Sequence, residues 1–278
     1  MGGEVVVVVL ARGRGRRMRE APRGSPSLTP GQRAAADAGQ KAMMPIAGAD
    51  GVEHPFLDYV LSTLADAGFR KVCLVVGSEQ GELRRRYSQA SRPTRISLKW
   101  AVQPEPRGTA DAVAAAEAFV AARPFVVVNA DNLYPVEGLR TLLSVEGPGL
   151  LVFERDELAA SSRIEVDRLA GFAMPILSPD GSLADIVEKP DLTRLQAAGA
   201  HALISMNAWR FDSRIFQACR DVPVSARGEF ELPDAVRLAI TRGVRFRAIA
   251  ARGPVLDLTS RDDIQHVASR LAGYQVRL

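Results

Sequence analysis

The sequence has 278 residues, of which 47% are hydrophobic and 24% are charged, a composition typical of a folded globular protein with one or two substantial cores. The formal net charge is +4, and the one dense basic cluster lies between Arg12 and Arg19, so this cluster needs an anionic partner or open solvent. No aromatic residues are interleaved with it, which disfavours a nucleic-acid-binding protein.

We expect neither a membrane anchor nor a secretory signal. The apolar run Val5–Leu10 is too short to cross a bilayer, and the segment Met1–Glu4 lacks the basic residues that begin a signal peptide. The expected location is the cytoplasm. Cys73 and Cys219 are far apart without CxxC spacing, and the three histidines are isolated, so we expect core cysteines and no zinc site.

Apolar segments of strand length, rich in valine and leucine, recur through the first half of the chain. They are Val5–Leu10, Lys71–Val76, Ile96–Val102, Phe125–Asn129 and Leu150–Phe153. Because they are almost continuously apolar, they predict strands that are covered on both faces. Helical spacing over Phe56–Ala65 predicts a helix that ends at Gly68, and alanine-rich Ala110–Ala122 predicts another, capped by Thr109 or Asp111. This alternation predicts an α/β fold, with a Rossmann-like, mostly parallel central sheet and helices on both faces.

The pattern becomes less regular after residue 154. Shorter strands are predicted at Ile164–Val166, Phe172–Leu177, Leu183–Val187 and Ala202–Trp209. A helix at Leu232–Arg242, ended by Gly243, a strand at Val244–Ile249 and a helix at Asp262–Ala272 follow. We interpret the chain as one domain, 1–278, in which residues 155–278 elaborate the sheet formed by residues 1–154. Residues 20–39 have no clear period and predict a mobile loop.

The first predicted strand leads into a turn that carries two glycines and several arginines, with the sequence Leu10-Ala11-Arg12-Gly13-Arg14-Gly15-Arg16-Arg17-Met18. Glycines let backbone N–H groups approach phosphate oxygens, and guanidinium groups bind phosphate bidentately. The spacing fits neither GxGxxG nor GxxxxGK[ST], which disfavours a nicotinamide enzyme. Taken alone, the turn is equally consistent with a solvated basic loop.

Asp131 comes directly after the predicted strand Phe125–Asn129, at the carboxyl end where open sheets bind ligands. A carboxylate in this place suits Mg²⁺, which prefers oxygen ligands. The alternative is that Asp131 and Asn132 only begin a turn, as Asp-Asn often does after a strand.

Read together, seven segments resemble the sugar-1-phosphate nucleotidyltransferase (NDP-sugar pyrophosphorylase) family, and in pattern most of all its glucose-1-phosphate thymidylyltransferases and uridylyltransferases. The arginine-rich turn resembles the LAAGxGTRM signature, and Gln40–Ile46 resembles the PKALLPV segment. Five more follow in the family's order: His54–Val60, Gln103–Val113, Asn129–Asn132, Val187–Pro190 and Asp257–Ser260.

The resemblance implies a magnesium-dependent enzyme that joins a sugar 1-phosphate to a nucleoside triphosphate, UTP or dTTP by preference, and releases pyrophosphate. It implies a nucleotide-binding half, 1–154, and a sugar-binding half, 155–278, with small-molecule substrates and neither nucleic acid nor membrane as partner. Dimers and tetramers both occur in the family, so a homo-oligomer is compatible with the resemblance.

The resemblance also implies a role for each matching residue. Arg17 and Lys41 would hold the phosphates during catalysis, and Asp131 and Asp257 would bind magnesium. The nucleotide would lie on Leu10, Gly13 and Gly15, its base read by the amide of Gln103 and the backbone of Gly108. Glu188 would accept sugar hydroxyls and Lys189 would bind the sugar phosphate.

Four positions depart from the family pattern: Arg12 and Arg16 replace a small residue and a threonine, and Ala130 and Thr259 replace glycines. Arg12 and Arg16 keep open the alternative of a non-catalytic nucleotide-sugar-binding protein with the same fold. A glycosyltransferase of related fold is disfavoured, because residues 130–132 do not form an Asp-x-Asp motif. We expect no acyltransferase extension, since the sequence ends soon after Asp257.

Overall fold

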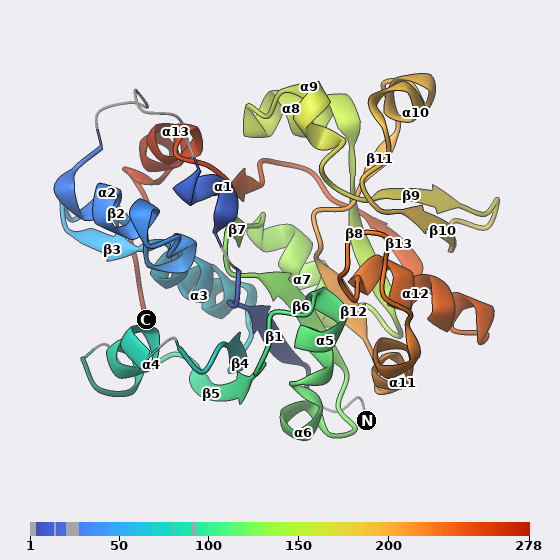
Figure 1. Cartoon of the computed structure of the whole chain (residues 1–278), viewed down its shortest axis with the longest axis horizontal. Coiled ribbons are helices and arrows are strands. Elements are labelled where there is room, and N and C mark those ends of the chain that lie inside the picture. The colour runs from blue at the N-terminus through green and yellow to red at the C-terminus, as the bar shows by residue number, and fades with distance from the viewer. Residues whose placement is uncertain (1–3, 14, 21–27, 80, 91–92) are drawn as a thin grey trace.

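The computed structural model describes residues 4–13, 15–20, 28–79, 81–90 and 93–278 (Figure 1). Within them, eight strands form the main sheet: β1 (Val6–Leu10), β4 (Lys71–Val76), β5 (Ser97–Val102), β6 (Phe125–Asn129), β8 (Gly149–Glu154), β11 (Leu203–Ile204), β12 (Trp209–Phe211) and β13 (Arg247–Ala250).

The strand order is β11-β8-β12-β6-β1-β4-β5, and β13 pairs with β8. Strands β4, β1 and β6 are parallel neighbours, β5 is parallel to β4, and β13 is parallel to β8. Strand β12 runs antiparallel to β6 and β8, as β11 does to β8. The mostly parallel α/β sheet expected from the sequence is therefore confirmed.

In the described parts of the chain, three small sheets lie outside the main one. They pair β2 (Pro45–Ala47) with β3 (Glu53–Pro55), β7 (Asn132–Leu133) with β14 (Leu256–Asp257), and β9 (Met174–Leu177) with β10 (Leu183–Val187). The second half of the chain thus extends the main sheet through β11, β12 and β13, whereas β9 and β10 form a ribbon of their own. The expected elaboration of the main sheet is therefore observed for β11, β12 and β13 but not for β9 and β10.

Strand β1 shows why its sequence is almost continuously apolar. Val7 and Val9 pack into one core and Val6 and Val8 into the other, and all four side chains are fully buried. The first core includes residues of α3 (Phe56–Ala67), α7 (Val136–Ser144) and α13 (Asp262–Leu271). The second includes residues of α5 (Thr109–Ala114), α6 (Glu117–Val120), α11 (Arg214–Asp221) and α12 (Leu232–Thr241). Helices therefore cover both faces.

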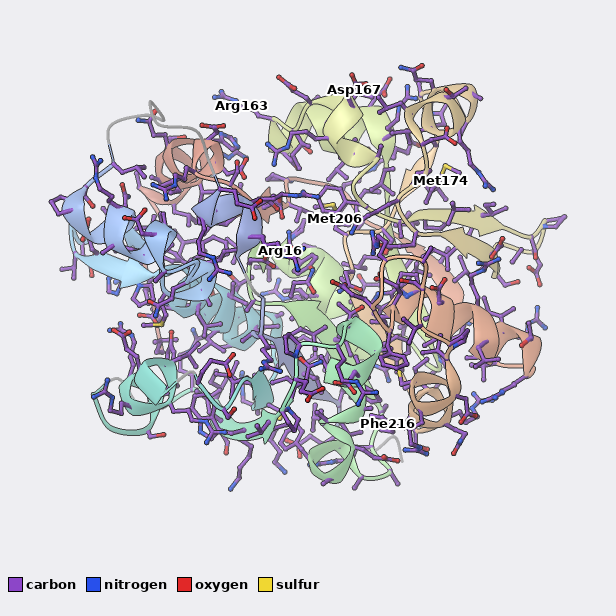
Figure 2. All side chains as sticks on the ribbon, viewed as in Figure 1. Arg16, Arg163, Asp167, Met174, Met206 and Phe216 are labelled. Atoms are coloured by element: carbon purple, nitrogen blue, oxygen red, sulfur yellow. The ribbon has the colours of Figure 1, made fainter. Side chains whose placement is uncertain are left out.

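Both cores draw on the two halves of the chain. Met174 and Met206 belong to the same core as Val7 and lie between the sheet and the upper part of the molecule, where Asp167 marks α9 (Val166–Leu169) (Figure 2). Cys73 and Cys219 are buried free thiols in the second core, as expected from the sequence.

Several predicted elements differ in detail. Helix α3 ends at Gly68, whose φ of 107° is the expected left-handed cap. The single helix expected over 110–122 is two helices, α5 and α6, and the predicted caps are wrong. Gly108 is the N-cap residue, while Thr109 Oγ1 accepts from Leu232 N and Asp111 accepts from Gln103.

The second half holds further corrections. The strand expected at Ile164–Val166 is absent, because Val166 begins α9, which follows α8 (Arg155–Ser162). The strand expected over 202–209 is divided into β11 and β12, and the positive φ of Asn207, 65°, lies between them. The predicted helix and strand after residue 231 are observed as α12 and β13, with α13 at the expected place.

Part of the loop expected over 20–39 is helical. Helix α2 (Pro30–Asp37) begins with a capping box between Thr29 and Gln32, and Pro30 occupies its first turn. Residues 21–27 lie outside the described residues. The remaining short helices are α1 (Arg16–Arg19), η1 (Lys41–Met43), α4 (Gly81–Arg85), η2 (Arg86–Ala90) and α10 (Leu192–Ala197). Among the helices of the described ranges, none combines the length and apolarity needed to cross a bilayer.

Candidate active site

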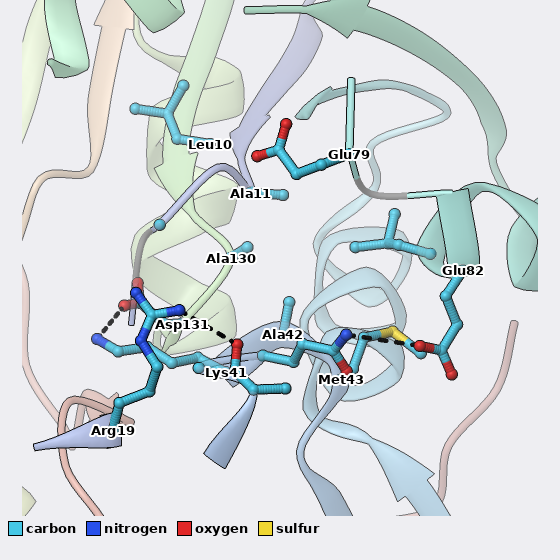
Figure 3. Close-up of a pocket in the computed structure, with 15 residues that line it drawn as sticks. Leu10, Ala11, Arg19, Lys41, Ala42, Met43, Glu79, Glu82, Ala130 and Asp131 are labelled. Atoms are coloured by element: carbon cyan, nitrogen blue, oxygen red, sulfur yellow. Dashed lines mark hydrogen bonds and ion pairs between the residues drawn. The ribbon is translucent and has the colours of Figure 1, made fainter. Parts of the chain in front are cut away.

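The parallel strands bring the chemically important segments to one edge of the sheet. Strands β1, β4, β5 and β6 share a direction, so the residues that follow them lie at the same edge, where α/β sheets bind ligands. The β1 pocket is lined by Leu10, Ala11, Gly13, Arg19, Lys41, Glu79, Glu82 and Asp131, among others (Figure 3). The Asp257 pocket is lined by Arg17, Asn129, Asp131, Glu188, Lys189, Asn207, Arg227 and Asp257, among others. Asp131 lines both pockets.

Lys41 and Asp131 form an ion pair where the two pockets meet. Lys41 Nζ lies 3.0 Å from Asp131 Oδ2, and Figure 3 shows the two side chains pointing toward each other. Buried Met44 and Ala42 anchor the η1 segment in the core, which leaves Lys41 facing the strand ends. Burial lowers the pKa of Lys41, but the charges of Asp131 and Asp257 outweigh it, so the pKa is raised and the amine stays protonated.

A pair of two-residue strands places Asp257 beside this ion pair. In the β7–β14 ladder Asp257 is opposite Asn132, and Leu258 N donates to Asp131 O at 2.9 Å. Asp257 is buried, and its Oδ1 accepts from Asn132 Nδ2 at 2.9 Å. Burial, and next the charge of Asp131, raises the pKa of Asp257 to about 6. The two carboxylates predicted from distant segments are thus brought together.

The other carboxylate oxygen of Asp257, Oδ2, has different surroundings. Oδ2 is buried without a hydrogen-bond partner among the described residues, and Arg168 Nη2 lies 3.7 Å away. A buried carboxylate oxygen in this state favours a metal or hydrogen-bond donor. No cluster of three or more His, Cys, Asp or Glu side chains suited to a metal occurs in the described ranges. The two neighbouring carboxylates, Asp131 and Asp257, are of the kind that magnesium takes when it binds one or two carboxylates and completes its shell with water and phosphate oxygens.

A directional chain of hydrogen bonds ends on Asp257. Trp209 Nε1 donates to Asn207 Oδ1 at 2.7 Å, and Asn207 Nδ2 donates to Asn129 Oδ1 at 2.7 Å. Asn129 Nδ2 then donates to Asn132 Oδ1 at 3.0 Å, and Asn132 donates to Asp257. An indole N–H can only donate and a carboxylate can only accept. The two ends of the chain therefore fix the orientation of every side-chain amide between them. The sequence reasoning missed this chain, because its members come from separate segments.

The arginine-rich turn is held close to the segment that carries Lys41. Gly15 has a φ of 58°, and a Cβ there would lie 2.2 Å from the backbone oxygen of Gly39, so this position requires glycine. Gly13 lines the β1 pocket, and a Cβ added to it would have nothing within 4 Å. Met18 is fully buried, and its carbonyl accepts from Arg261 Nε at 2.8 Å.

The arginines of this turn point to different surroundings. Arg17 is exposed on α1 and lines the Asp257 pocket. Arg16 is exposed and lines neither pocket. Arg12 Nη2 pairs with Glu79 Oε2 at 3.3 Å. Arg14 lies outside the described residues.

Gln103 and Gly108 are in direct contact. Gln103 is 2% exposed, and its Nε2 donates to Gly108 O at 3.0 Å and to Asp111 Oδ2 at 2.8 Å. Gly108 has a φ of 126°, and a Cβ there would lie 2.4 Å from Phe230 O. The backbone of this loop is further tied to Phe230, whose nitrogen donates to Arg107 O at 2.8 Å.

Glu188 and Lys189 follow β10 and line the Asp257 pocket. Arg227 Nη2 lies 3.3 Å from Glu188 Oε1 and also contacts Glu231. Burial raises the pKa of Glu188, with Glu231 adding to the rise, while Lys189 and Arg227 oppose it. Arg227 and Glu231 were not predicted from the sequence as site residues. The charged run that carries them, Arg227-Gly228-Glu229-Phe230-Glu231, was the available signal.

Comparisons with known proteins show similarity to nucleotidyltransferases. A family model described as nucleotidyl transferase matches residues 37–270. The UTP–glucose-1-phosphate uridylyltransferase of Haloferax volcanii is 24% identical over 95% of this chain and 95% of its own length. The low-salt glycan biosynthesis nucleotidyltransferase of the same organism is 26% identical over 81% of this chain, which spans 58% of that relative. The crystal structure of a UDP-glucose pyrophosphorylase complexed with UDP-glucose superposes with a TM-score of 0.71 at 18% identity, covering 96% of this chain and 97% of that one, and shows the same fold.

Proposed function

Because the chain belongs to the nucleotidyl transferase family, we propose that it joins a sugar 1-phosphate to UTP or dTTP, giving a nucleotide-activated sugar and pyrophosphate. Family membership confirms the resemblance noted in the sequence. The observation that carries the proposal is the meeting of two pockets at Lys41 and Asp131, with buried Asp257 beside them.

In the proposed reaction, an oxygen of the sugar phosphate attacks the α-phosphorus of the triphosphate. The bond from that phosphorus to the oxygen bridging to the β-phosphate breaks, and pyrophosphate leaves with the electron pair. Both reactants are anionic, so the main requirement is to hold and neutralise them in line. Lys41, whose raised pKa keeps it cationic, and Arg17 supply that positive charge from the two pockets that meet at Asp131.

The carboxylates prepare the site for magnesium. Asp131 and Asp257 would hold the ion, which when bound supplies a Lewis acid that neutralises phosphate charge. The amide chain from Trp209 fixes Oδ1 of Asp257, while Oδ2 has no hydrogen-bond partner among the described residues and would take this role. Such outer contacts orient ligands and tune affinity.

Each substrate has a place in this scheme. The nucleotide would lie over Leu10, Gly13 and Gly15, with its base at Gln103 and Gly108. The sugar would lie in the Asp257 pocket, with its hydroxyls on Glu188 and its phosphate on Lys189. The uridylyltransferase relative supports a nucleotide-sugar product. Support for the assignment of a keto base comes from Gln103, whose oxygen is left to accept from an imide N–H.

The test is pyrophosphate release from UTP or dTTP in the presence of Mg²⁺ and a panel of sugar 1-phosphates. Wild type should turn over at least one pair of substrates, and Asp131→Ala should lose activity by roughly 100-fold or more, as removal of a group that stabilises transition-state charge does. Asp156→Ala is the matched control. Asp156 lies at the start of α8, and within the described residues its side chain pairs only with that of its neighbour Arg155. Nucleotide binding without any turnover would favour the non-catalytic alternative.

A further inference from the structure

The orientation of the Gln103 amide is determined by its neighbours. Nε2 faces two groups, the carbonyl oxygen of Gly108 and the carboxylate of Asp111. Both can only accept hydrogen bonds, so the amide nitrogen, and not its oxygen, must lie on that side. Both N–H groups of Gln103 are consequently used within the protein, and Oε1 is the atom that the side chain can offer to a ligand.

We propose that Asp111 is a positioning residue for base selection: by holding Gln103 in this orientation, it makes the site accept bases with a keto-imide edge and reject bases with an amino edge. The accepted bases are uracil, thymine and guanine, and the rejected bases are cytosine and adenine. This inference rests on the proposed function, in which Gln103 and Gly108 face the base.

The selection follows from the order of donors and acceptors. Uracil and thymine present O4 as acceptor beside N3–H as donor, and guanine presents O6 beside N1–H in the same order. Cytosine and adenine present the reverse, an amino donor beside a ring-nitrogen acceptor. Against Gln103 Oε1, an acceptor, and the N–H of Gly108, a donor, the keto bases make two hydrogen bonds, whereas the amino bases meet two like groups.

Asp111 supplies the stronger part of this restraint. Its hydrogen bond to Gln103 is charge-assisted and 2.8 Å long, while Gly108 O also accepts from Ala112 N in the first turn of α5. A reversed amide would place Oε1 against a carboxylate and leave both N–H groups of a residue 2% exposed without these partners. Asp111 has no competing role as helix cap, because Gly108 is the N-cap residue.

The experiment measures dissociation constants of UTP, CTP, GTP and ATP by calorimetry, on the full chain with Mg²⁺. Comparing UTP with CTP, and GTP with ATP, keeps base size constant and isolates the edge. Wild type should prefer the keto member of each pair. Asp111→Ala frees the amide to reverse, and both preferences should narrow by roughly 10-fold, the worth of one hydrogen bond to a charged group.

Two further variants separate positioning from structure. Asp111→Asn keeps an acceptor oxygen without the charge and should retain most of the wild-type preference. Glu117→Ala is the control: Glu117 is an acidic residue in the first turn of the next helix, α6, and its side chain contacts Arg220 and not Gln103. This variant should change neither the UTP-to-CTP nor the GTP-to-ATP affinity ratio. If Asp111→Ala does not fold, Asp111→Leu, which is close in shape but lacks an acceptor, gives the same comparison.

The inference would be overturned if Asp111→Ala bound all four nucleotides more weakly by the same factor, or if its UTP-to-CTP and GTP-to-ATP affinity ratios were those of wild type. A wild-type protein that binds CTP as tightly as UTP would also overturn it. Pyrophosphate release in the same preparations separates this result from the proposed function. A wild type that selects keto bases without turnover refutes the enzyme alone, and one that turns over with ratios insensitive to Asp111 refutes this inference alone.

Discussion

The buried charge of Asp257 predicts that this residue weakens the metal-free fold. Its pKa is raised to about 6 from the ordinary value of 3.8, first by burial and then by Asp131. A shift of this size corresponds to about 3 kcal/mol of lost stability at neutral pH, since each pKa unit is worth about 1.4 kcal/mol. Asp257→Asn removes the charge and keeps an oxygen for Asn132, so the metal-free variant should be more stable than wild type by up to about 3 kcal/mol.

The pH dependence of this difference has a definite sign. Because the folded state holds the Asp257 proton more tightly than the unfolded state, wild type loses stability as pH rises from about 4 to about 6, and the variant lacks this loss. The stability gap should be largest above pH 6 and close to zero below pH 4. Urea denaturation in the presence of a chelator, at pH values across this window, measures it.

Two controls make the measurement specific. Asp262→Asn removes an exposed acid from the first turn of α13 and should show no gap of this size or pH dependence. Adding Mg²⁺ should stabilise wild type by mass action but not Asp257→Asn, if the carboxylate is a ligand. A variant no more stable than wild type at neutral pH, or a gap that does not change with pH, would show that the buried charge is already compensated.

Three shorter predictions concern the turn and the amide chain. Arg17→Ala should lower kcat by roughly 100-fold with a smaller change in KM, because Arg17 lines the Asp257 pocket. Arg16 does not line this pocket, so Arg16→Thr should keep kcat and KM near the wild-type values. Initial-rate measurements compare the two variants. Gly15→Ala should destabilise the fold by about 1–3 kcal/mol, whereas Gly13→Ala, in open space, should change the unfolding free energy by less than about 0.5 kcal/mol. Asn132→Ala should weaken binding of Mn²⁺, used as a probe for Mg²⁺, by roughly 10-fold in calorimetry, and an unchanged affinity would contradict a ligand-orienting role.

The sequence predicted the parts of the fold that have a local signal. Strands β4 and β6 have the predicted bounds, because a run of apolar residues, mostly valine, between turn residues is visible in the sequence itself. The helix that ends at Gly68 carries its own stop signal. Helix α2 was missed although Thr29, Pro30 and Gln32 form a start signal, since the face that it buries consists of small residues, Ala35 and Ala36, and is too short to show a clear period.

The candidate site likewise contains residues with a local sequence signal and residues without one. Asp131 was predictable from its place after a strand, whereas the position of Asp257 depends on two strands of two residues each, β7 and β14, which are too short to have a periodicity. The chain of amides from Trp209 and the contact of Arg227 with Glu188 likewise join segments that are far apart in sequence. Only tertiary packing decides such contacts, so residue patterns could name the candidate site residues but not how they are held.

Each departure from the family pattern has its own structural setting. Arg12 pairs with Glu79 and Arg16 is exposed, and neither residue lines the β1 pocket or the Asp257 pocket. Ala130 is 3% exposed, and its methyl group packs in the first core. Thr259 lines the Asp257 pocket, but its backbone nitrogen donates to Asp263, which anchors the loop after β14. The two arginine substitutions motivated the non-catalytic alternative. In the structure they leave the proposed phosphate-binding residues at the pockets, Lys41 at the β1 pocket and Arg17 at the Asp257 pocket.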